Sequence, residues 1–210
     1  MNVIACVHQK GGTGKTTLAI SVALTLAQQN QRVLLLDTDY QSTASDWGQQ
    51  FGEVFNIVVR SQVQANIQLE QDIKHFQTHF NWCVIDAAPT LSDITVKILQ
   101  ICHELLIPIR PALPDIWAIS RLASLIHQTH RAVGYIPKTK VIFNQYQGEI
   151  LPPLYAALMQ YHLPVSSTLL PLDPRFAALF TGQSLSPSLR RLVQNLLTEE
   201  IPKKIFNEQK

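Results

Sequence analysis

The segment Lys10-Gly11-Gly12-Thr13-Gly14-Lys15-Thr16-Thr17 decides the fold, because it joins an apolar, β-branched run to a helical pattern. Residues 3–7 are typical of a buried strand, and Leu18, Val22 and Leu26 recur at the spacing of a helix with one apolar face. A glycine-rich turn in this position lets successive N–H groups point at phosphate oxygens, beside the positive end of the helix dipole. The segment therefore predicts a phosphate-binding loop.

The polar residues of this loop have separate expected tasks. Lys15 is expected to reach the β- and γ-phosphates, the Thr16 hydroxyl to ligate Mg²⁺, and Thr17 to donate to the α-phosphate. The standard pattern G-x-x-x-x-G-K-[ST] fails because its first glycine would fall at Gln9, whereas K-G-G-x-G-K-[ST] fits. ATP and Mg²⁺ are the expected ligands. Backbone N–H groups would come from Gly11, Gly12, Thr13 and Gly14.

Further apolar runs alternate with longer helical patterns along the chain. They lie at residues 33–36, 57–59, 82–85, 105–109 and 141–143, and weakly at 167–170. This alternation implies right-handed crossovers and a mainly parallel sheet with helices on both faces. Pro152 and Pro153 are expected to open a helix over 154–161, and Pro108, Pro111 and Pro114 to punctuate a loop after the fifth strand. We expect one α/β domain over residues 1–210, with any disorder confined to the last few residues.

Carboxylates follow two of the predicted strands. Asp37 and Asp39 end the run 33–36, and Asp86 ends the run 82–85. Ligands bind beyond the carboxyl ends of strands in open parallel sheets, and phosphoryl transfer depends on positioning and neutralised charge. The alternative is that Asp37 and Asp39 form a turn or cap a helix.

Composition excludes several classes of protein. Hydrophobic residues make up 46% and charged residues 15%, which fits a well-buried sheet protein and not a disordered one. No apolar run reaches the roughly 18 residues of a membrane-spanning helix, so we expect a cytoplasmic protein without stable membrane insertion. Cys6, Cys83 and Cys102 show no C-x-x-C pair and are expected to be buried, reduced thiols.

Positive charge is concentrated in the C-terminal third of the chain. Residues 1–130 hold 8 basic and 10 acidic groups, whereas residues 131–210 hold 9 and 5. A polyanion surface, if present, is expected in that third, and an ordinary solvated surface is the alternative. The candidate DNA contacts are Arg175, Arg190, Arg191, Lys203 and Lys204.

Residues 8–17 resemble the deviant Walker A box of the ParA/MinD ATPases. The resemblance implies a three-layer P-loop NTPase fold in which the strands of the Walker A and Walker B motifs are adjacent. It also implies that Lys10 reaches across a dimer interface to the phosphates of the partner's ATP, in a homodimer that encloses two ATP molecules. The small members of the family lack an N-terminal DNA-binding domain, and we expect this chain to be of that kind.

Two further segments resemble the family's carboxylate motifs. Residues 34–41 are similar to its D-x-D-P-Q segment, which implies that Asp39 orients the attacking water and that Asp37 supports the metal shell. Residues 82–89 resemble a Walker B motif, which implies that Asp86 holds Mg²⁺ directly or through water. Tyr40 and Ala88 stand where the family usually has prolines, so both loops depart from its pattern.

The resemblance continues more loosely downstream. It implies that Asn144 reads the adenine edge, with a strand-end cap as the alternative, and that Pro171 packs against the base. Leu172 replaces an arginine frequent in the family, so no role is carried over to it. Residues 107–118 look like the proline-rich segment that lines the dimer face in small ParA proteins.

The function that this resemblance implies is a slow, partner-stimulated ATPase that binds non-specific nucleoid DNA as an ATP dimer. A ParB-like or other adaptor would couple it to a plasmid, chromosome or protein cargo. One alternative is a MinD-like switch on a membrane surface, with Leu192, Val193, Leu196 and Leu197 lying on lipid or packing on the sheet. Others are an iron–sulfur carrier, for which the cysteines are poorly placed, and a metabolic kinase, for which no acceptor pocket can be recognised.

Overall fold

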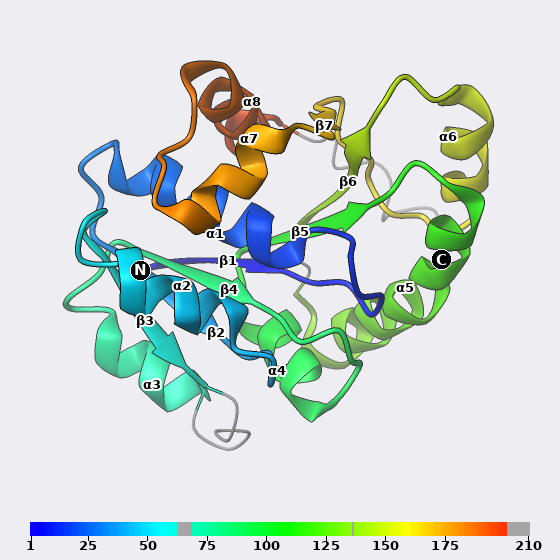
Figure 1. Ribbon diagram of the computed structural model, residues 1–210. Coiled ribbons are helices and arrows are strands. Elements are labelled where there is room, and N and C mark those ends of the chain that lie inside the picture. The colour runs from blue at the N-terminus through cyan, green and yellow to red at the C-terminus, as the bar shows by residue number, and fades with distance from the viewer. Residues whose placement is uncertain (63–68, 136, 201–210) are drawn as a thin grey trace.

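The computed structural model describes residues 1–62, 69–135 and 137–200. Within them, seven strands form one sheet in the order β3-β2-β4-β1-β5-β6-β7, and every neighbouring pair is parallel (Figure 1). The parallel α/β fold is thus confirmed, and the expectation of a single domain over the whole chain stays a prediction. The strands are β1 (Asn2–Cys6), β2 (Val33–Asp37), β3 (Ile57–Ser61), β4 (Trp82–Asp86), β5 (Glu104–Ile109), β6 (Lys138–Tyr146) and β7 (Leu170–Pro171).

Helices cover both faces of the sheet, with α1 and α8 on one side and α4 and α5 on the other (Figure 1). This gives the three layers that the alternating pattern predicts. The helices are α1 (Lys15–Ala27), α2 (Thr43–Phe51), α3 (Leu69–Phe76), α4 (Asp93–Ile101), α5 (Leu113–Val133), α6 (Pro152–Met159), α7 (Pro174–Ala177), the 3-10 helix η1 (Ala178–Thr181) and α8 (Pro187–Thr198).

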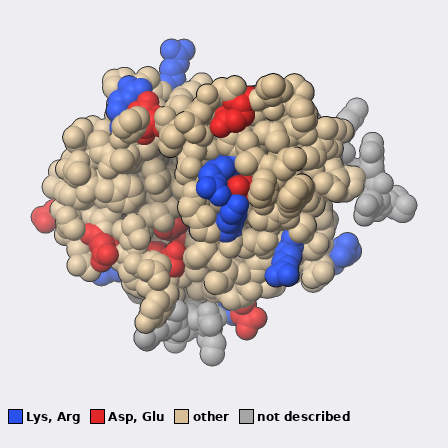
Figure 2. Space-filling view, turned by 45° about the vertical axis from the view of Figure 1, so that its right-hand side comes forward, with Lys and Arg blue, Asp and Glu red and all other residues tan. Residues whose placement is uncertain are grey.

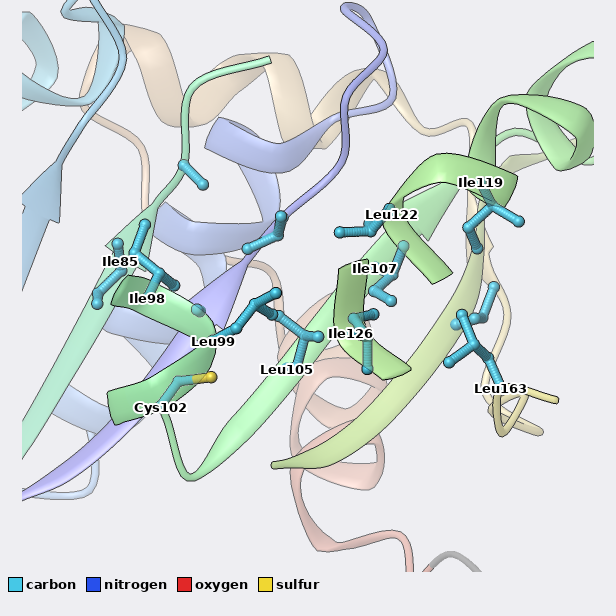
Figure 3. Packing of buried hydrophobic residues seen from close by; sticks show 14 of the residues in the cluster. Ile85, Ile98, Leu99, Cys102, Leu105, Ile107, Ile119, Leu122, Ile126 and Leu163 are labelled. Carbon is cyan, nitrogen blue, oxygen red and sulfur yellow. The ribbon is translucent and has the colours of Figure 1, made fainter. Parts of the chain in front are cut away.

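Successive residues of the central strand β1 belong to different cores. Val3 and Ala5 pack into the cluster under α4 and α5, whereas Ile4 and Cys6 pack into the cluster under α1 and α8. Because strand side chains alternate in direction, a strand covered on both faces must be apolar throughout. Figure 3 shows the first cluster, in which α4 and α5 press on β4 and β5 through Ile85, Ile98, Leu99, Leu105, Ile107, Ile119, Leu122 and Ile126. The three cysteines are buried and unpaired, as predicted.

Helix α1 is more deeply buried than its predicted single apolar face. Every residue from Leu18 to Leu26 is buried, because the sheet lies on one side of the helix and α8 packs against the other. Small polar residues are tolerated there because their hydroxyls bond within the helix. Ser21 donates to the Thr17 carbonyl at 2.7 Å and Thr25 to the Ser21 carbonyl at 2.8 Å.

The three prolines after residue 107 do not form one loop, so that prediction is wrong. Pro108 lies inside β5, opposite Ile142, and Pro114 lies in the first turn of α5. Pro108 is tolerated because the β1–β5 pairing ends at Leu106, whose carbonyl accepts the Val7 N–H. Past that point β1 has ended, so the missing N–H costs no ladder hydrogen bond.

Two strands and one helix differ from their predicted bounds. β6 runs over nine residues, well beyond 141–143, and β7 has only two residues at the end of the predicted 167–170. The backbone before β7 instead joins the sheet edge through a bridge from Val165 to Val141. Helix α6 begins at Pro152 itself, because a proline in the first turn has no N–H to leave unpaired, and it ends at Met159.

Candidate functional site

The loop from Lys10 to Gly14 leaves the carboxyl end of β1 and enters α1 directly. Gly12 and Gly14 have φ angles of +74° and +88°, which favour glycine, and a Cβ on Gly11 or Gly12 would meet no atom within 4 Å. The main-chain N–H groups of residues 11–17 have no hydrogen-bond acceptor among the described residues. A row of unpaired donors at a helix N-terminus is a binding site for an anion such as a phosphate chain.

The end of β6 holds this loop from behind. The Asn144 amide donates to the Thr13 carbonyl at 2.7 Å, and Gln145 Nε2 donates to the Gly12 carbonyl at 3.0 Å. Gly14 lies so close that a Cβ there would be 2.3 Å from Asn144 Nδ2. The predicted base-reading residue therefore also clamps the phosphate loop, which the sequence did not reveal.

Lys15 and Asp86 lie at the floor of the loop. Lys15 is 6% exposed, and burial lowers its pKa although Asp86 and Asp39 oppose the shift. Burial raises the pKa of Asp86 to about 7, while the Thr16 side chain and Lys15 act in the other direction. β1 and β4 are neighbours in the sheet, with Cys6 opposite Asp86, which confirms the predicted adjacency of the two motif strands.

The carboxylate of Asp86 is suited to a divalent cation. Both of its oxygens are buried without a well-formed hydrogen bond to any described residue. A buried anion in this condition is stabilised by a divalent ion, and Mg²⁺ is usually held by one or two protein oxygens together with substrate phosphates. Thr16 and Asp86 supply that donor set. No group of three or more His, Cys, Asp or Glu side chains suited to a metal is present among the described residues.

Asp37 braces the turn that follows β2. Its Oδ1 accepts the Asp39 N–H at 3.0 Å, and its Oδ2 accepts the Ser45 N–H at 2.8 Å and the Ser45 hydroxyl at 2.9 Å. Ser45 lies in the first turn of α2, so Asp37 caps that helix from outside. Both of its oxygens thus accept hydrogen bonds from the protein. These contacts are the ones expected under the alternative interpretation, in which Asp37 forms a turn and caps a helix.

Asp39 lies on the open side of the same turn. One of its oxygens accepts the Gln41 N–H at 3.0 Å, and its charge acts on Lys15. The preceding Thr38 is tied to the Asp86 carbonyl by both its N–H, at 2.9 Å, and its hydroxyl, at 3.0 Å. The β2 and β4 ends therefore form one unit that holds Asp39 near the phosphate loop. Tyr40, which replaces the family's proline, is 81% exposed.

Lys10 is held within its own chain. Its Nζ lies 2.8 Å from Asp115 Oδ2, and the same carboxylate receives Arg110 Nε at 2.9 Å and Nη2 at 3.2 Å. The loop is tied to the same helix a second time, because Gln9 Nε2 donates to the Ala118 carbonyl. No short sequence pattern signals the pairing of Lys10 with Asp115, because the two meet only where β1 and β5 end side by side in the sheet.

His8 supports the loop in its neutral form. It is fully buried, and burial together with the Lys15 charge lowers its pKa to about 4. Its Nδ1 accepts the Lys10 N–H at 2.9 Å, so the proton lies on Nε2. A neutral imidazole adds no further positive charge behind the loop.

A pocket of about 460 Å³ opens beside the loop. Gly14, Thr17, Asn144 and Pro171 line it, together with the apolar rings of Phe176 and Phe180. The structure thus brings the predicted base-contact residues Asn144 and Pro171 to one cavity next to Thr17. An apolar slot with a few amide groups beside a phosphate loop fits a nucleoside base.

The three basic candidates that the structure describes lie in α7 and α8. Arg175 is paired with Asp173 at 2.6 Å and reaches the Ser188 hydroxyl at 3.2 Å, while Arg190 donates to Gln28 Oε1 at 3.0 Å. Arg191 is exposed. Lys203 and Lys204 lie outside the described residues. On the face shown in Figure 2, basic groups are scattered and do not form one patch.

The apolar stripe of α8 packs inward. Leu189, Val193 and Leu196 are at most 1% exposed and belong to the core that also contains α1. Of the four residues expected to lie on lipid or to pack on the sheet, Val193 and Leu196 are thus covered by protein, and Leu192 and Leu197 are partly buried against the same core. In the part of the chain that the structure describes, no helix has the length and hydrophobicity needed to cross a bilayer.

Comparisons with known proteins agree with this geometry. The protein Maintenance of carboxysome distribution protein A from Gloeobacter kilaueensis is 33% identical over 132 residues, which are 62% of this chain and 56% of that protein. The protein of the same name from Halothiobacillus neapolitanus is 29% identical over 146 residues, which are 68% of this chain and 65% of that protein. The chain thus spans less than two thirds of the length of these curated relatives.

A solved structure and a family description complete the comparison. An ATP complex of Cyanothece McdA superposes with a TM-score of 0.76 at 19% identity, covering 93% of this chain and 95% of the other, which shows a common fold. Residues 4–185 match the family described as the CobQ/CobB/MinD/ParA nucleotide binding domain. That match includes the glycine-rich loop, all three carboxylates and the pocket beside the loop, and the chain therefore belongs to the CobQ/CobB/MinD/ParA family of nucleotide-binding domains.

Proposed function

We propose that this protein is an ATPase switch that dimerises with ATP, binds nucleoid DNA without sequence preference and positions a cargo. An adaptor of the ParB-like or another class would stimulate hydrolysis and so release the dimer. The two named relatives concern carboxysome distribution, which supports a protein assembly as the first cargo class to test. Plasmids and chromosomes are the other classes. The protein would be cytoplasmic and associated with the nucleoid.

The proposal is carried by one observation: the buried carboxylate of Asp86 has no ion-pair partner among the described residues and lies with Lys15 at the floor of a loop whose N–H groups are unpaired. In this arrangement Lys15 neutralises the phosphate chain, Thr17 donates to it, and Asn144 and Pro171 hold the base. Thr16 and Asp86 would hold Mg²⁺, which supplies further neutralising charge. Asp39 would orient the attacking water, while Asp37 fixes the turn that carries Asp39.

Dimerisation follows from the second lysine of the loop. Lys15 already lies at the floor of the loop, whereas the Lys10 side chain is 32% exposed and lies at its outer rim. Once it leaves Asp115, an ammonium there could neutralise a triphosphate presented by a second copy of the chain. The exposed Leu113 and Trp117 in the first turns of α5 lie beside Asp115 and supply apolar area for such an interface.

The ATP dimer is tested by light scattering with ATP and Mg²⁺, together with nucleotide affinity and phosphate release. Lys15→Ala should abolish ATP binding, Lys10→Ala should bind ATP but stay monomeric, and Asp39→Ala should accumulate as a dimer. Lys74→Ala, which removes an exposed lysine paired only with Glu70, is the matched control and should behave as wild type. A Lys10→Ala protein that dimerises normally with ATP would contradict the assignment.

The surface to which the dimer binds is tested separately. DNA retardation with and without ATP should show binding only by the dimer, and affinity should fall steeply with salt because phosphate contacts release counterions. Co-sedimentation with anionic liposomes is the parallel arm, and binding there in place of DNA would favour the membrane switch. The burial of Leu189, Val193 and Leu196 against the core argues for the DNA outcome.

A further inference from the structure

Asp115 is a buried carboxylate that two cations share. The residue is 2% exposed, whereas the side chains of its two partners are 32% exposed for Lys10 and 42% exposed for Arg110. Burial raises the pKa of Asp115, but the hydrogen bonds from Arg110 and Lys10 outweigh it and the net pKa lies below the ordinary range. The carboxylate is therefore charged, and it is more than neutralised.

The two cations contact Asp115 in different ways. Arg110 binds both oxygens, with Nε on Oδ1 and Nη2 on Oδ2, whereas Lys10 makes a single contact with Oδ2. A bidentate guanidinium satisfies a carboxylate by itself. Lys10 can consequently leave while Arg110 still pairs with the buried carboxylate. If Lys10 were the only partner, its departure would leave Asp115 as an unpaired buried charge, which is strongly unfavourable.

We propose that Asp115 holds Lys10 inside its own subunit before the dimer forms, and that Arg110 keeps Asp115 neutralised once Lys10 has turned to the partner's nucleotide. The inference rests on the dimeric function proposed above and deepens it. Asp115 and Arg110 are positioning residues in this scheme, because they act through Lys10 and touch no substrate. Gln9, bound to the Ala118 carbonyl, keeps the loop on α5 while the Lys10 side chain changes partner.

The scheme makes opposite predictions for the two residues. Asp115→Asn removes the competitor for Lys10, so the dimer dissociation constant with a non-hydrolysable ATP analogue should fall about threefold, the size of a partly exposed ion pair. Arg110→Ala makes Lys10 the sole partner of a buried carboxylate, so the same constant should rise about tenfold. Arg110→Lys should recover part of that loss. ATP affinity of the monomer should not change.

A double-variant cycle separates this scheme from a direct role of Arg110 at the interface. In the Asp115→Asn background, Arg110→Ala should have no effect on the dissociation constant, because there is no carboxylate left to neutralise. If the loss persists undiminished in that background, Arg110 contacts the partner directly and the scheme is overturned. Glu70→Gln, which removes the exposed carboxylate that pairs with Lys74 in α3, is the control and should leave the dimer dissociation constant unchanged.

A second measurement uses the nucleotide-free monomer and does not depend on dimerisation. The rate at which an amine-modifying reagent labels Lys10, followed by peptide mass spectrometry, should rise about threefold in Asp115→Asn and not in Glu70→Gln. If labelling rises but wild type never dimerises with ATP, Lys10 is held as inferred and the proposed function fails. If wild type dimerises while Asp115→Asn changes neither measurement, the holding of Lys10 is refuted and the proposed function stands.

Discussion

Replacing Gly14 by alanine tests whether the end of β6 clamps the phosphate loop. Gly14 combines a φ of +88° with a close approach, because its added Cβ would lie 2.3 Å from Asn144 Nδ2. The side chain of Asn144 would have to move, and its hydrogen bond to the Thr13 carbonyl would break. Gly12 has nearly the same strain, with a φ of +74°, but its Cβ would meet nothing within 4 Å.

The expected free energies follow from these two geometries. Alanine in the left-handed region costs about 1 kcal/mol, which is the whole effect expected for Gly12→Ala. Gly14→Ala adds the loss of one buried hydrogen bond and the displacement of a packed amide, about 1 to 2 kcal/mol more. We therefore expect Gly14→Ala to lower the free energy of unfolding by about 2 to 3 kcal/mol.

Urea unfolding of the nucleotide-free protein measures these differences directly. The excess cost of Gly14→Ala over Gly12→Ala should largely vanish in an Asn144→Ala background, because the colliding amide is then absent. Equal costs for the two glycine variants, within about 0.5 kcal/mol, would refute the argument that Asn144 supports the loop.

Three further outcomes are expected. Burial raises the pKa of Asp86 from 3.8 to about 7, so its stabilising contribution is complete below about pH 4 and is lost as the pH rises through about 7. In urea unfolding without nucleotide or metal, wild type should therefore lose up to about 4 kcal/mol of stability relative to Asp86→Asn across that window. A difference between the two proteins that does not change with pH would contradict this. Ser45→Ala should lower the free energy of unfolding by about 1 kcal/mol, because Asp37 loses the hydrogen bond from the hydroxyl but keeps the one from the Ser45 N–H. The looser turn around Asp39 should also slow phosphate release. Unchanged stability and an unchanged rate would show that Asp37 and Ser45 do not hold this turn. Arg191→Ala should lower DNA affinity for all sequences alike and reduce the slope of log affinity against log salt by about 1, whereas an unchanged slope would remove Arg191 from the DNA surface.

The parts of the site that lie within a few residues of one another are predictable from the sequence. The strand, glycine loop and helix over residues 3–26 follow from local periodicity and from backbone angles that glycine favours. Asp39 and Asp86 follow from the rule that ligand groups lie at the carboxyl ends of parallel strands. Asn144 lines the pocket, and its contact with a base stays a prediction. Its hold on Thr13 could not be predicted, because the two residues are 131 positions apart.

Several features depend on packing between distant parts of the chain. Helix α1 is buried all round because α8 covers the side away from the sheet. Residues 18–26 are apolar or small on every side, which is typical of such a helix, and the expectation of a single apolar face missed that pattern. The placement of Pro108 inside β5 depends on where β1 stops pairing, which is set by the exit of the phosphate loop. The apolar stripe of α8 is equally suited to a membrane and to a core, and only the folded chain shows that Val193 and Leu196 pack into the core that contains α1.

Residue types and local spacing were enough to recognise the phosphate loop, because a phosphate cradle needs particular residues at fixed spacing within one turn of chain. The balance of charge around that loop could be read only from the folded chain. The fold brought Arg110 and Asp115, which follow the carboxyl end of the neighbouring strand β5, to Lys10, and it buried Asp86 with no ion-pair partner among the described residues. Charges act through space, so their balance depends on which strand ends are adjacent and how deeply they are buried.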